Sequence, residues 1–479
     1  MSFHARLVTL AVLCGGLFPS LATAQPGIYL PGAGAVHAGM AGVSTAAPLD
    51  AIGALYWNPA AIGRLGRNEV SIGGAFVYPD ISVSSSRPRL DGTILSGTTR
   101  SDNGFPLVPS IGIVSQLEEG SPVTFGFGLL ALGGGGVNFP GDPNNPVLSP
   151  TGPFGQFVIG PIFSNIQILQ LNPTISYQAT ERLVIGVGPT IDITMASFSP
   201  AFFTRPNLIP DQPNTFPAAT NARPYWGGGM RAGLVYSLTD ALDFGFGYTS
   251  PQWLETWRFN ASDNLGNPQT LSLKASLPAI YSWGIAWRGI ERLTLGLDLR
   301  YFDYKNTDLF GTPVSEGGLG WENTFVSAIG ADYQLTDRLA VRGGYQYNAC
   351  PLRNTSTLFN IQSPAIIQNT ISAGATLKVT DAMSMSLGYA YGFQNSIEGY
   401  VAQVPTARTS LQASSHSLLF NVQAQFGGGA TRKSKPIRIS TSDSLPGQEL
   451  ASIVAVDSNS SIPVSVEQLP GSGVTLLPR

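Results

Sequence analysis

Charged residues are scarce in this chain: they make up 11% of its 479 residues, less than half of the roughly 25% that is usual in soluble domains. A basic excess is also missing, because the net charge is −3, and this argues against neutralisation of a nucleic-acid backbone. After the first 24 residues no uninterrupted apolar run reaches the ~18 residues that a membrane-spanning helix needs. Only Cys14 and Cys350 are present. Because Cys14 lies in a predicted signal peptide, no intramolecular disulfide is expected.

Glycine and aromatic residues are plentiful: 56 residues are Gly and 10% are aromatic. Together with the low charge, this composition suggests β-structure with a polar interior and an apolar exterior. The N-terminus carries Arg6, a short apolar run over Leu7–Leu17 and the small-residue site Ala22-Thr23-Ala24. We interpret residues 1–24 as a secretory signal peptide.

The region 69–426 alternates apolar and polar residues with a period of two. Leu293, Leu295 and Leu297, for example, alternate with Thr294, Gly296 and Asp298, which places the two sets on opposite faces of a strand. Fourteen such segments are predicted, near 70–80, 107–117, 123–132, 165–178, 183–196, 225–238, 242–257, 278–288, 292–305, 321–335, 339–349, 369–379, 382–394 and 415–426.

The connections between these segments alternate between short turns and long loops. The long loops are expected near 81–106, 133–164, 197–224, 258–277, 306–320, 350–368 and 395–414. An even strand number and this alternation are typical of bacterial outer-membrane barrels. We therefore predict an all-β fold, a 14-stranded antiparallel transmembrane β-barrel over 69–426. It is preceded by an N-terminal segment over 25–68 and followed by a flexible periplasmic tail over 427–479. A soluble β-sandwich is the alternative, but its outer face would carry charge.

Six charged residues fall on the polar phase of their strands and are expected to face the barrel lumen, because a charge facing lipid is costly. They are Asp192, Arg231, Asp298, Arg300, Asp332 and Arg342. Two interpretations remain open: the charges pair with one another and stiffen the barrel, which we favour, or they line a polar passage.

Little in the sequence indicates catalysis. Only His37 and His416 remain after processing, and no cysteine–histidine metal spacing or nucleophile motif is present. A barrel esterase using His416 and a neighbouring serine is a minor alternative. We predict that the protein is not an enzyme and needs no cofactor or metal.

The segment 31–62 carries Gly32, Gly34, Gly39 and Gly42, followed by Tyr56-Trp57-Asn58-Pro59-Ala60. This pattern resembles the N-terminal hatch of the FadL/TodX family of outer-membrane transporters for long-chain fatty acids and other hydrophobic compounds. Later pieces fit as well, such as Leu277-Pro278-Ala279 and Gly343–Tyr347, so that the resemblance covers roughly 31–426. It departs at Pro48-Leu49-Asp50, where the family usually has adjacent acidic residues, and in the tail.

The resemblance implies a barrel plugged by the hatch, with capture of the substrate at an outer groove, an inner pocket against the hatch, and lateral exit beside a kinked third strand. The implied hatch and gating residues are Tyr56, Trp57, Asn58, Pro59 and Ala60, although Asn58-Pro59 also reads as a simple helix stop. The substrate-binding candidates on the long loops are Phe198, Phe202, Phe203, Leu208, Ile209, Phe216, Leu271 and Leu273. These residues equally suit a small loop core. Gly126, Gly128 and Gly133 are candidates for the lateral exit, because alternation fails over Leu129–Leu132 and indicates a bulge.

The function expected from these features is passive uptake of long-chain fatty acids or similar hydrophobic molecules. A general porin or a structural or adhesive barrel is the alternative. The expected partners are the hydrophobic substrate and the lipid and lipopolysaccharide of a Gram-negative-type outer membrane, with no nucleic acid, and the protein is expected to be a monomer. A carboxylate substrate would need a cationic partner, for which Arg205, Arg223 and Arg258 are candidates.

Overall fold

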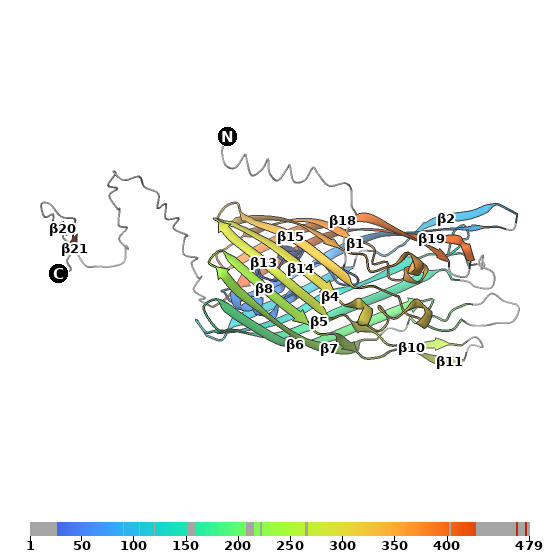
Figure 1. The fold of residues 1–479 in the computed structure, drawn as a ribbon, viewed down its shortest axis with the longest axis horizontal. Coiled ribbons are helices and arrows are strands. Elements are labelled where there is room, and N and C mark those ends of the chain that lie inside the picture. Colours follow the sequence, from blue (N-terminus) through green and yellow to red (C-terminus); the bar gives the residue numbers. More distant parts are fainter. Residues whose placement is uncertain are drawn as a thin grey trace, which may run out of the picture. The chain divides into compact units, whose positions relative to one another are not determined.

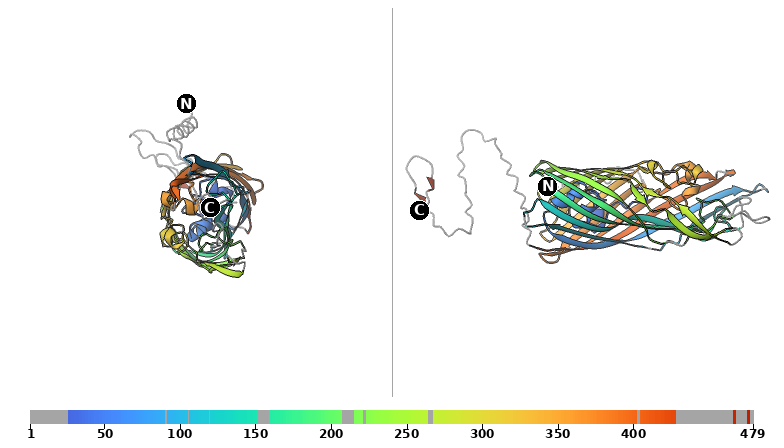
Figure 2. Two further views of the ribbon diagram at one scale, coloured as in Figure 1. Left: turned by 90° about the vertical axis from the view of Figure 1, so that its right-hand side faces the viewer. Right: turned by 90° about the horizontal axis from the view of Figure 1, so that it is seen from below.

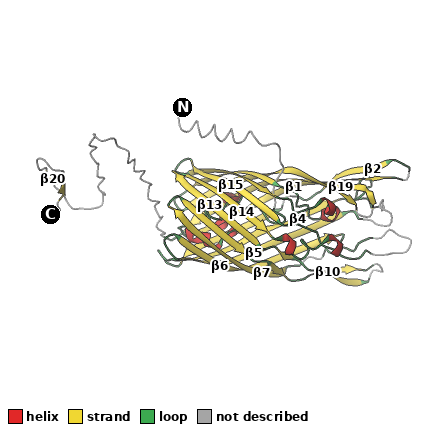
Figure 3. Cartoon of the chain, in the orientation of Figure 1, coloured by secondary structure: helices red, strands yellow, loops and turns green. Residues whose placement is uncertain are grey.

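The structure is a computed structural model that describes residues 26–89, 91–104, 106–118, 120–150, 159–206, 215–220, 223–263, 267–401, 404–427, 466–467 and 475–476. Strands dominate it (Figure 3). Within the described residues, every helix is too short or too polar to cross a bilayer. The chain divides into two compact units, Met1–Thr431 and Arg432–Arg479. In the second unit the described residues form one antiparallel pair, β20 (Val466–Glu467) and β21 (Thr475–Leu476).

Fourteen strands of the first unit pair in a closed antiparallel ring (Figure 1). In ring order they are β1 (Glu69–Pro88), β3 (Leu107–Gln116), β4 (Val123–Phe139), β5 (Ile162–Gln178), β6 (Leu183–Ser199), β7 (Tyr225–Thr239), β8 (Leu242–Thr249), β13 (Ile280–Ile290), β14 (Leu293–Phe302), β15 (Thr324–Gln334), β16 (Leu339–Asn348), β17 (Asn369–Lys378), β18 (Met383–Val401) and β19 (Val404–Gln425). The ring closes where β19 pairs with β1, from Glu69 opposite Gln425 onward. The predicted 14-stranded barrel is therefore confirmed.

The two faces of the strands have the polarity expected of a barrel in lipid. On β14, Leu295 and Leu297 are 36% and 40% exposed, whereas Asp298 and Arg300 are buried. Apolar side chains thus point outward and charged side chains inward, the reverse of a soluble β-sandwich.

Several strands run further than alternation predicts. β1 continues to Pro88 and pairs there with β2 (Ile94–Arg100), and β18 and β19 extend through most of the predicted last loop, to Val401 and from Val404. The loop predicted over 258–277 contains the hairpin β10 (Trp257–Ser262) and β11 (Pro268–Leu273). Backbone pairing can continue beyond the lipid, where one face no longer needs to be apolar, so these extensions leave no period-two signal.

Short elements complete the long connections. They are β9 (Gln252–Leu254), β12 (Ser276–Leu277) and the 3₁₀ helices η2 (Tyr304–Asn306), η3 (Val314–Glu316), η4 (Asn354–Ser356) and η5 (Leu358–Asn360).

The N-terminal segment, residues 26–68, lies inside the ring. It contains α2 (Gly34–Ala38), α3 (Ala51–Tyr56) and the 3₁₀ helix η1 (Pro59–Arg64). The helix α2 contacts β1 and β17–β19, α3 contacts β1, β3 and β4, and η1 contacts β4–β8. The end-on view shows these blue helices enclosed by the strands (Figure 2). The segment therefore occupies the space that an open pore would need.

Candidate functional site

Both ends of α3 are held by charged side chains, one from the N-terminal segment itself and two from the barrel wall. At its N-terminus, Asp50 accepts a hydrogen bond from Gly53 N at 2.8 Å, and Glu69 of β1 accepts one from Ala51 N at 2.8 Å. At its C-terminus, Arg231 of β7 donates to the carbonyl oxygens of Leu55 and Tyr56 at 2.6 and 2.7 Å. Carboxylates at the start of a helix and a cation at its end satisfy unpaired backbone groups and match the helix dipole.

Asn58 ties the same segment to the wall and begins η1. Its Nδ2 donates to the carbonyl oxygens of Thr45 and Leu234, at 2.8 and 3.0 Å, and its Oδ1 accepts from Ala60 N at 3.0 Å. Pro59 occupies the first turn of η1, where its missing N–H costs nothing. Asn58-Pro59 thus starts a helix as well as following one, since α3 ends at Tyr56.

Asp298 and Arg300 of β14 form a second anchor. Asp298 Oδ2 accepts from Ser44 N, Thr45 N and Thr45 Oγ1 at 2.8–3.1 Å. Arg300 Nη2 lies 2.5 Å from Asp298 Oδ2 and donates to Gly42 O at 2.5 Å. The Arg300 guanidinium also stacks over the Trp57 ring, with Cζ 4.4 Å from its centroid.

The other charged residues of the six predicted for the lumen are also buried. Arg342 Nε donates to Asp332 Oδ1 at 2.9 Å across β15 and β16. Asp192 Oδ1 accepts from Gln170 Nε2 at 2.7 Å. These contacts join the charged side chains to one another, to neighbouring strands or to the N-terminal segment.

β4 separates from β3 halfway along its length. The two strands pair only from Thr124–Gln116 to Leu130–Ser110. Opposite β5, the register shifts between Ala131 and Gly133, which confirms the bulge predicted in this strand.

Residues 28–30 pair with part of the β4 edge that β3 leaves unpaired. Leu30 N donates to Leu132 O at 2.8 Å, Gly134 N donates to Ile28 O at 2.9 Å, and Tyr29 and Gly133 form an antiparallel bridge. Tyr56 Oη lies 3.1 Å from the same Leu132 oxygen and 3.1 Å from Leu30 O. Burial raises the pKa of the Tyr56 phenol, so that it keeps its proton for donation.

The three glycines predicted for a lateral exit occupy different surroundings on β4. A side chain at Gly133 would overlap the carbonyl oxygen of Ile28, so the close approach of the N-terminal segment requires glycine there. Cβ atoms at Gly126 and Gly128 would meet only side chains, of Leu55 and Ile62 for Gly126 and chiefly of Leu130 for Gly128. Gly133 alone of the three lies at the bulge.

The aromatic candidates gather in one cluster, although Phe198 lies on β6, which runs on to Ser199, and not in the loop predicted for it. The Phe198 ring lies 5.8 Å from Phe203, 6.3 Å from Trp257 and 6.2 Å from Phe259, and Phe202 lies 5.4 Å from Phe216. Leu271 and Leu273 are buried in the same cluster, whereas Leu208 and Ile209 lie outside the described residues.

A small cavity of about 50 Å³ adjoins this cluster and is lined in part by Phe198, Phe202, Phe203 and Leu273. The geometry is that of a packed loop core with a small internal space. Of the cationic candidates, Arg223 pairs with Glu255 at 2.9 Å.

Sequence reasoning missed three residues that hold the N-terminal segment, two of them on barrel strands and one in η2. Glu69, Tyr304 and Asn421 contact it: Tyr304 Oη donates to Pro26 O at 2.7 Å and Asn421 Nδ2 donates to Asp50 Oδ2 at 2.8 Å. Burial raises the pKa of the Tyr304 phenol. The alternation of the last strand places Asn421 on the inward face, but no sequence signal shows which N-terminal residue it contacts.

Residues 17–427 match the family model described as "Outer membrane protein transport protein (OMPP1/FadL/TodX)". Outer membrane protein P1 of Haemophilus influenzae is 23% identical over 433 residues, covering 81% of this chain and 89% of its own length.

Solved structures share the fold. The P. putida toluene transporter TodX has a TM-score of 0.62 at 18% identity, covering 83% of this chain and 99% of its own. A Pseudomonas aeruginosa FadL homologue has a TM-score of 0.64 at 19% identity, with 84% and 99% covered. The Ralstonia pickettii toluene transporter TbuX has a TM-score of 0.59 at 17% identity, with 83% and 99% covered.

Proposed function

The chain belongs to the OMPP1/FadL/TodX family of outer-membrane transport proteins, and from this premise we propose that it takes up long-chain fatty acids or similar hydrophobic molecules by passive diffusion. The barrel lies in the outer membrane. Its route has three parts: capture at the outer aromatic cluster, an inner pocket bounded by the N-terminal segment, and lateral exit beside β4. The segment 26–68 acts as the hatch of this route.

Capture is assigned to the cluster of Phe198, Phe203 and Phe259. Phe198 lies at the end of β6, Phe203 follows it in the connection to β7, and Phe259 lies on β10. The three rings pack together, and Phe198 and Phe203 line a small cavity. Apolar clusters on long outer loops are common binding surfaces. A flexible substrate chain enters by displacing rings from one another, because the cavity in the closed cluster is smaller than such a molecule.

The inner pocket is assigned to the face of the hatch that carries Tyr56 and Trp57. The Tyr56 and Trp57 rings lie 4.5 Å apart edge to face, and Trp57 lies 6.1 Å from Phe302 of β14. Asn58, Pro59 and Ala60 fix this turn to the wall below. The gating step is a movement of the hatch that breaks its hydrogen bonds to Arg231 and to the carbonyl oxygen of Leu234.

The single observation that carries the proposal is the edge of β4. Beyond Leu130, where β3 no longer pairs with β4, the backbone groups of Leu132 and Gly134 bond to residues 28–30 instead. A hydrocarbon chain gains ~0.8 kcal/mol for each CH₂ removed from water. An exit into the bilayer retains that gain, whereas passage through a water-filled pore loses it.

The alternatives of a general porin or an adhesive barrel are less well supported. A porin requires an open polar lumen, and here buried hydrogen bonds join the N-terminal segment to β4, β7, β14 and β19. An adhesive role is expected to use polar loops, whereas the described loops contain the aromatic cluster.

Uptake of radiolabelled oleate by a strain lacking the gene tests the proposal. The full chain restores uptake while small-solute leakage stays low, and a variant lacking residues 26–65 leaks small solutes. Absence of uptake with the full chain contradicts the transport function. Equal leakage from both proteins contradicts the hatch.

A further inference from the structure

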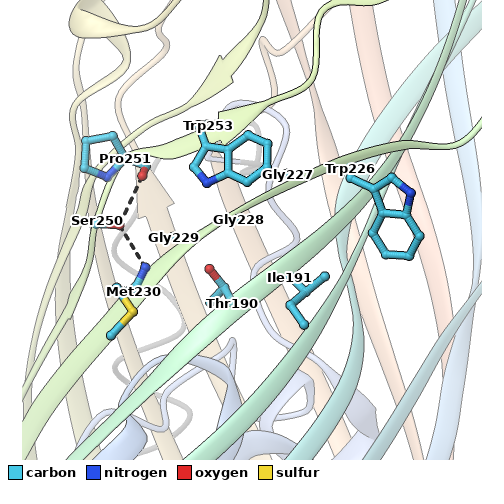
Figure 4. A pocket seen from close by; sticks show the side chains of 10 residues that line it. All are labelled: Thr190, Ile191, Trp226, Gly227, Gly228, Gly229, Met230, Ser250, Pro251 and Trp253. Carbon is cyan, nitrogen blue, oxygen red and sulfur yellow. Dashed lines mark hydrogen bonds between the residues drawn. The ribbon is translucent and has the colours of Figure 1, made fainter.

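A hollow of about 650 Å³ opens on the outer wall where β6, β7 and β9 meet (Figure 4). Its rim consists of Ile191, Trp226, Met230 and Trp253, whose side chains are exposed by 38%, 53%, 56% and 62%. The volume lies within the roughly 300–1,000 Å³ of pockets that bind small molecules. None of these residues contributes to the route described above.

The hollow arises from missing side chains and an interrupted ladder. Gly227, Gly228 and Gly229 form its floor on β7. β7 pairs with β8 up to Arg231 opposite Thr249, and with β9 from Gly228 opposite Trp253. Between these two pairs β7 has two residues, whereas the chain from β8 to β9 has three. One of these three, Pro251, has no backbone N–H to donate.

The side chain of Gln252 lies directly behind Gly229 in the floor of the hollow, since a Cβ atom at Gly229 would overlap its amide. It is fully buried; its Oε1 accepts from Thr190 Oγ1, and its Nε2 donates to Ser250 O at 2.6 Å. Because both ends of this amide are bonded within the wall, material that fills the hollow arrives from the membrane side.

The position along the barrel matches the outer membrane interface. Met230 and Trp226 lie in the half of β7 away from its short turn at Thr239. With a rise of ~3.3 Å per residue and a tilt of about 40°, they lie roughly 20–35 Å from that turn, at the outer edge of an apolar band about 25 Å tall. Tryptophan favours this interface.

We propose that the hollow is a lipid-binding site that takes one acyl chain of an outer-leaflet lipid. The chain lies over the glycine floor between Trp226 and Trp253, with its head group at the level of these rings. Empty apolar space facing lipid is unfavourable because its lining loses packing contacts. An acyl chain is the apolar material that the bilayer supplies there, and the site does not depend on transport.

Photolabelling tests the proposal. The wild-type protein is placed in phosphatidylethanolamine vesicles containing a phosphatidylethanolamine with a diazirine in its acyl chain, illuminated, and mapped by peptide mass spectrometry. Labelling of residues 226–230 and 250–254 is expected to exceed several-fold that of 283–287, where Trp283 and Trp287 also face lipid. Equal labelling of the two regions overturns the proposal.

Two matched variants extend the test. Ile191→Trp places a large ring over Gly228, its partner across the β6–β7 ladder, and reduces the labelling to the level of 283–287. Ile371→Trp, on the lipid-facing side of β17, leaves it unchanged. If added oleate reduces the labelling of the wild-type protein and added unlabelled phosphatidylethanolamine does not, the hollow binds the transported compound. That result would overturn the lipid assignment.

Discussion

Asn421, near the end of the last barrel strand, donates a 2.8 Å hydrogen bond to the carboxylate of Asp50 in the hatch, although 371 residues separate the two in sequence. Both side chains are buried. Asp50 also begins α3, so the position of this helix depends on strand β19, which closes the ring.

Asp50→Ala is expected to destabilise the hatch. The variant removes the N-terminal cap of α3 and leaves an N–H of Asn421 without its acceptor. We expect the free energy of unfolding to fall by roughly 2–4 kcal/mol. Denaturant titration followed by the fluorescence of buried tryptophans measures it. Asp337→Ala, which breaks an exposed pair with Arg292, is the control and costs less than about 1 kcal/mol. Equal losses would contradict this role of Asp50.

Arg231→Met is expected to loosen the end of α3. The variant leaves the carbonyl oxygens of Leu55 and Tyr56 without these donors, which costs roughly 2–4 kcal/mol for two hydrogen bonds to a charged group. Hydrogen exchange of residues 51–60 is predicted to become faster than in the wild type. Arg292→Met, an exposed arginine on a short turn, serves as the comparison, and unchanged exchange in both proteins would disprove the anchoring.

Gly133→Val is expected to detach residues 28–30 from β4, because its side chain overlaps the carbonyl oxygen of Ile28. Gly135→Val is a closely matched control two residues further along, where an added Cβ meets no described atom within 4 Å. Amide exchange of Leu30 and Gly134 reports the difference. Slow exchange in both variants would show that the contact does not require glycine.

Phe203→Ala is expected to lower uptake several-fold, because the capture cluster loses a ring that lies 5.8 Å from Phe198 and 6.0 Å from Phe259. Phe76→Ala, on the outer face of β1, removes the same ring from a lipid-facing position. If both variants transport oleate equally at matched expression, the cluster is a packing core and not a capture site.

The barrel was predictable because each strand has one face toward lipid. On β14, the alternation of Leu293, Leu295 and Leu297 with polar residues reports that constraint directly. The constraint ends beyond the membrane, so the extension of β1 to Pro88 and the β10–β11 hairpin left no comparable pattern. The bulge at Leu132 was visible because it breaks the alternation itself.

The partners of the inward side chains were not predictable. The sequence places Arg231 and Asp298 in the lumen, but their bonds to Tyr56 and Thr45 depend on the path of the hatch through the ring. That path has no periodicity, since α2, α3 and η1 are each six residues or shorter. Hatch contacts such as Asp50–Asn421 join opposite ends of the chain and follow only from the closed ring.

Deletion of Leu132 tests lateral exit most directly. Ala131 pairs with Leu169 and Gly133 with Ile168, so Leu132 is the extra residue of the bulge, and its removal allows β4 to continue straight beside β3. Radiolabelled oleate uptake is measured in cells that produce equal amounts of folded wild-type and variant barrel, with a deletion of exposed Asp91 in the β1–β2 turn as the control. The account predicts that loss of Leu132 abolishes uptake while loss of Asp91 preserves it; wild-type uptake without Leu132 would contradict an exit at β4.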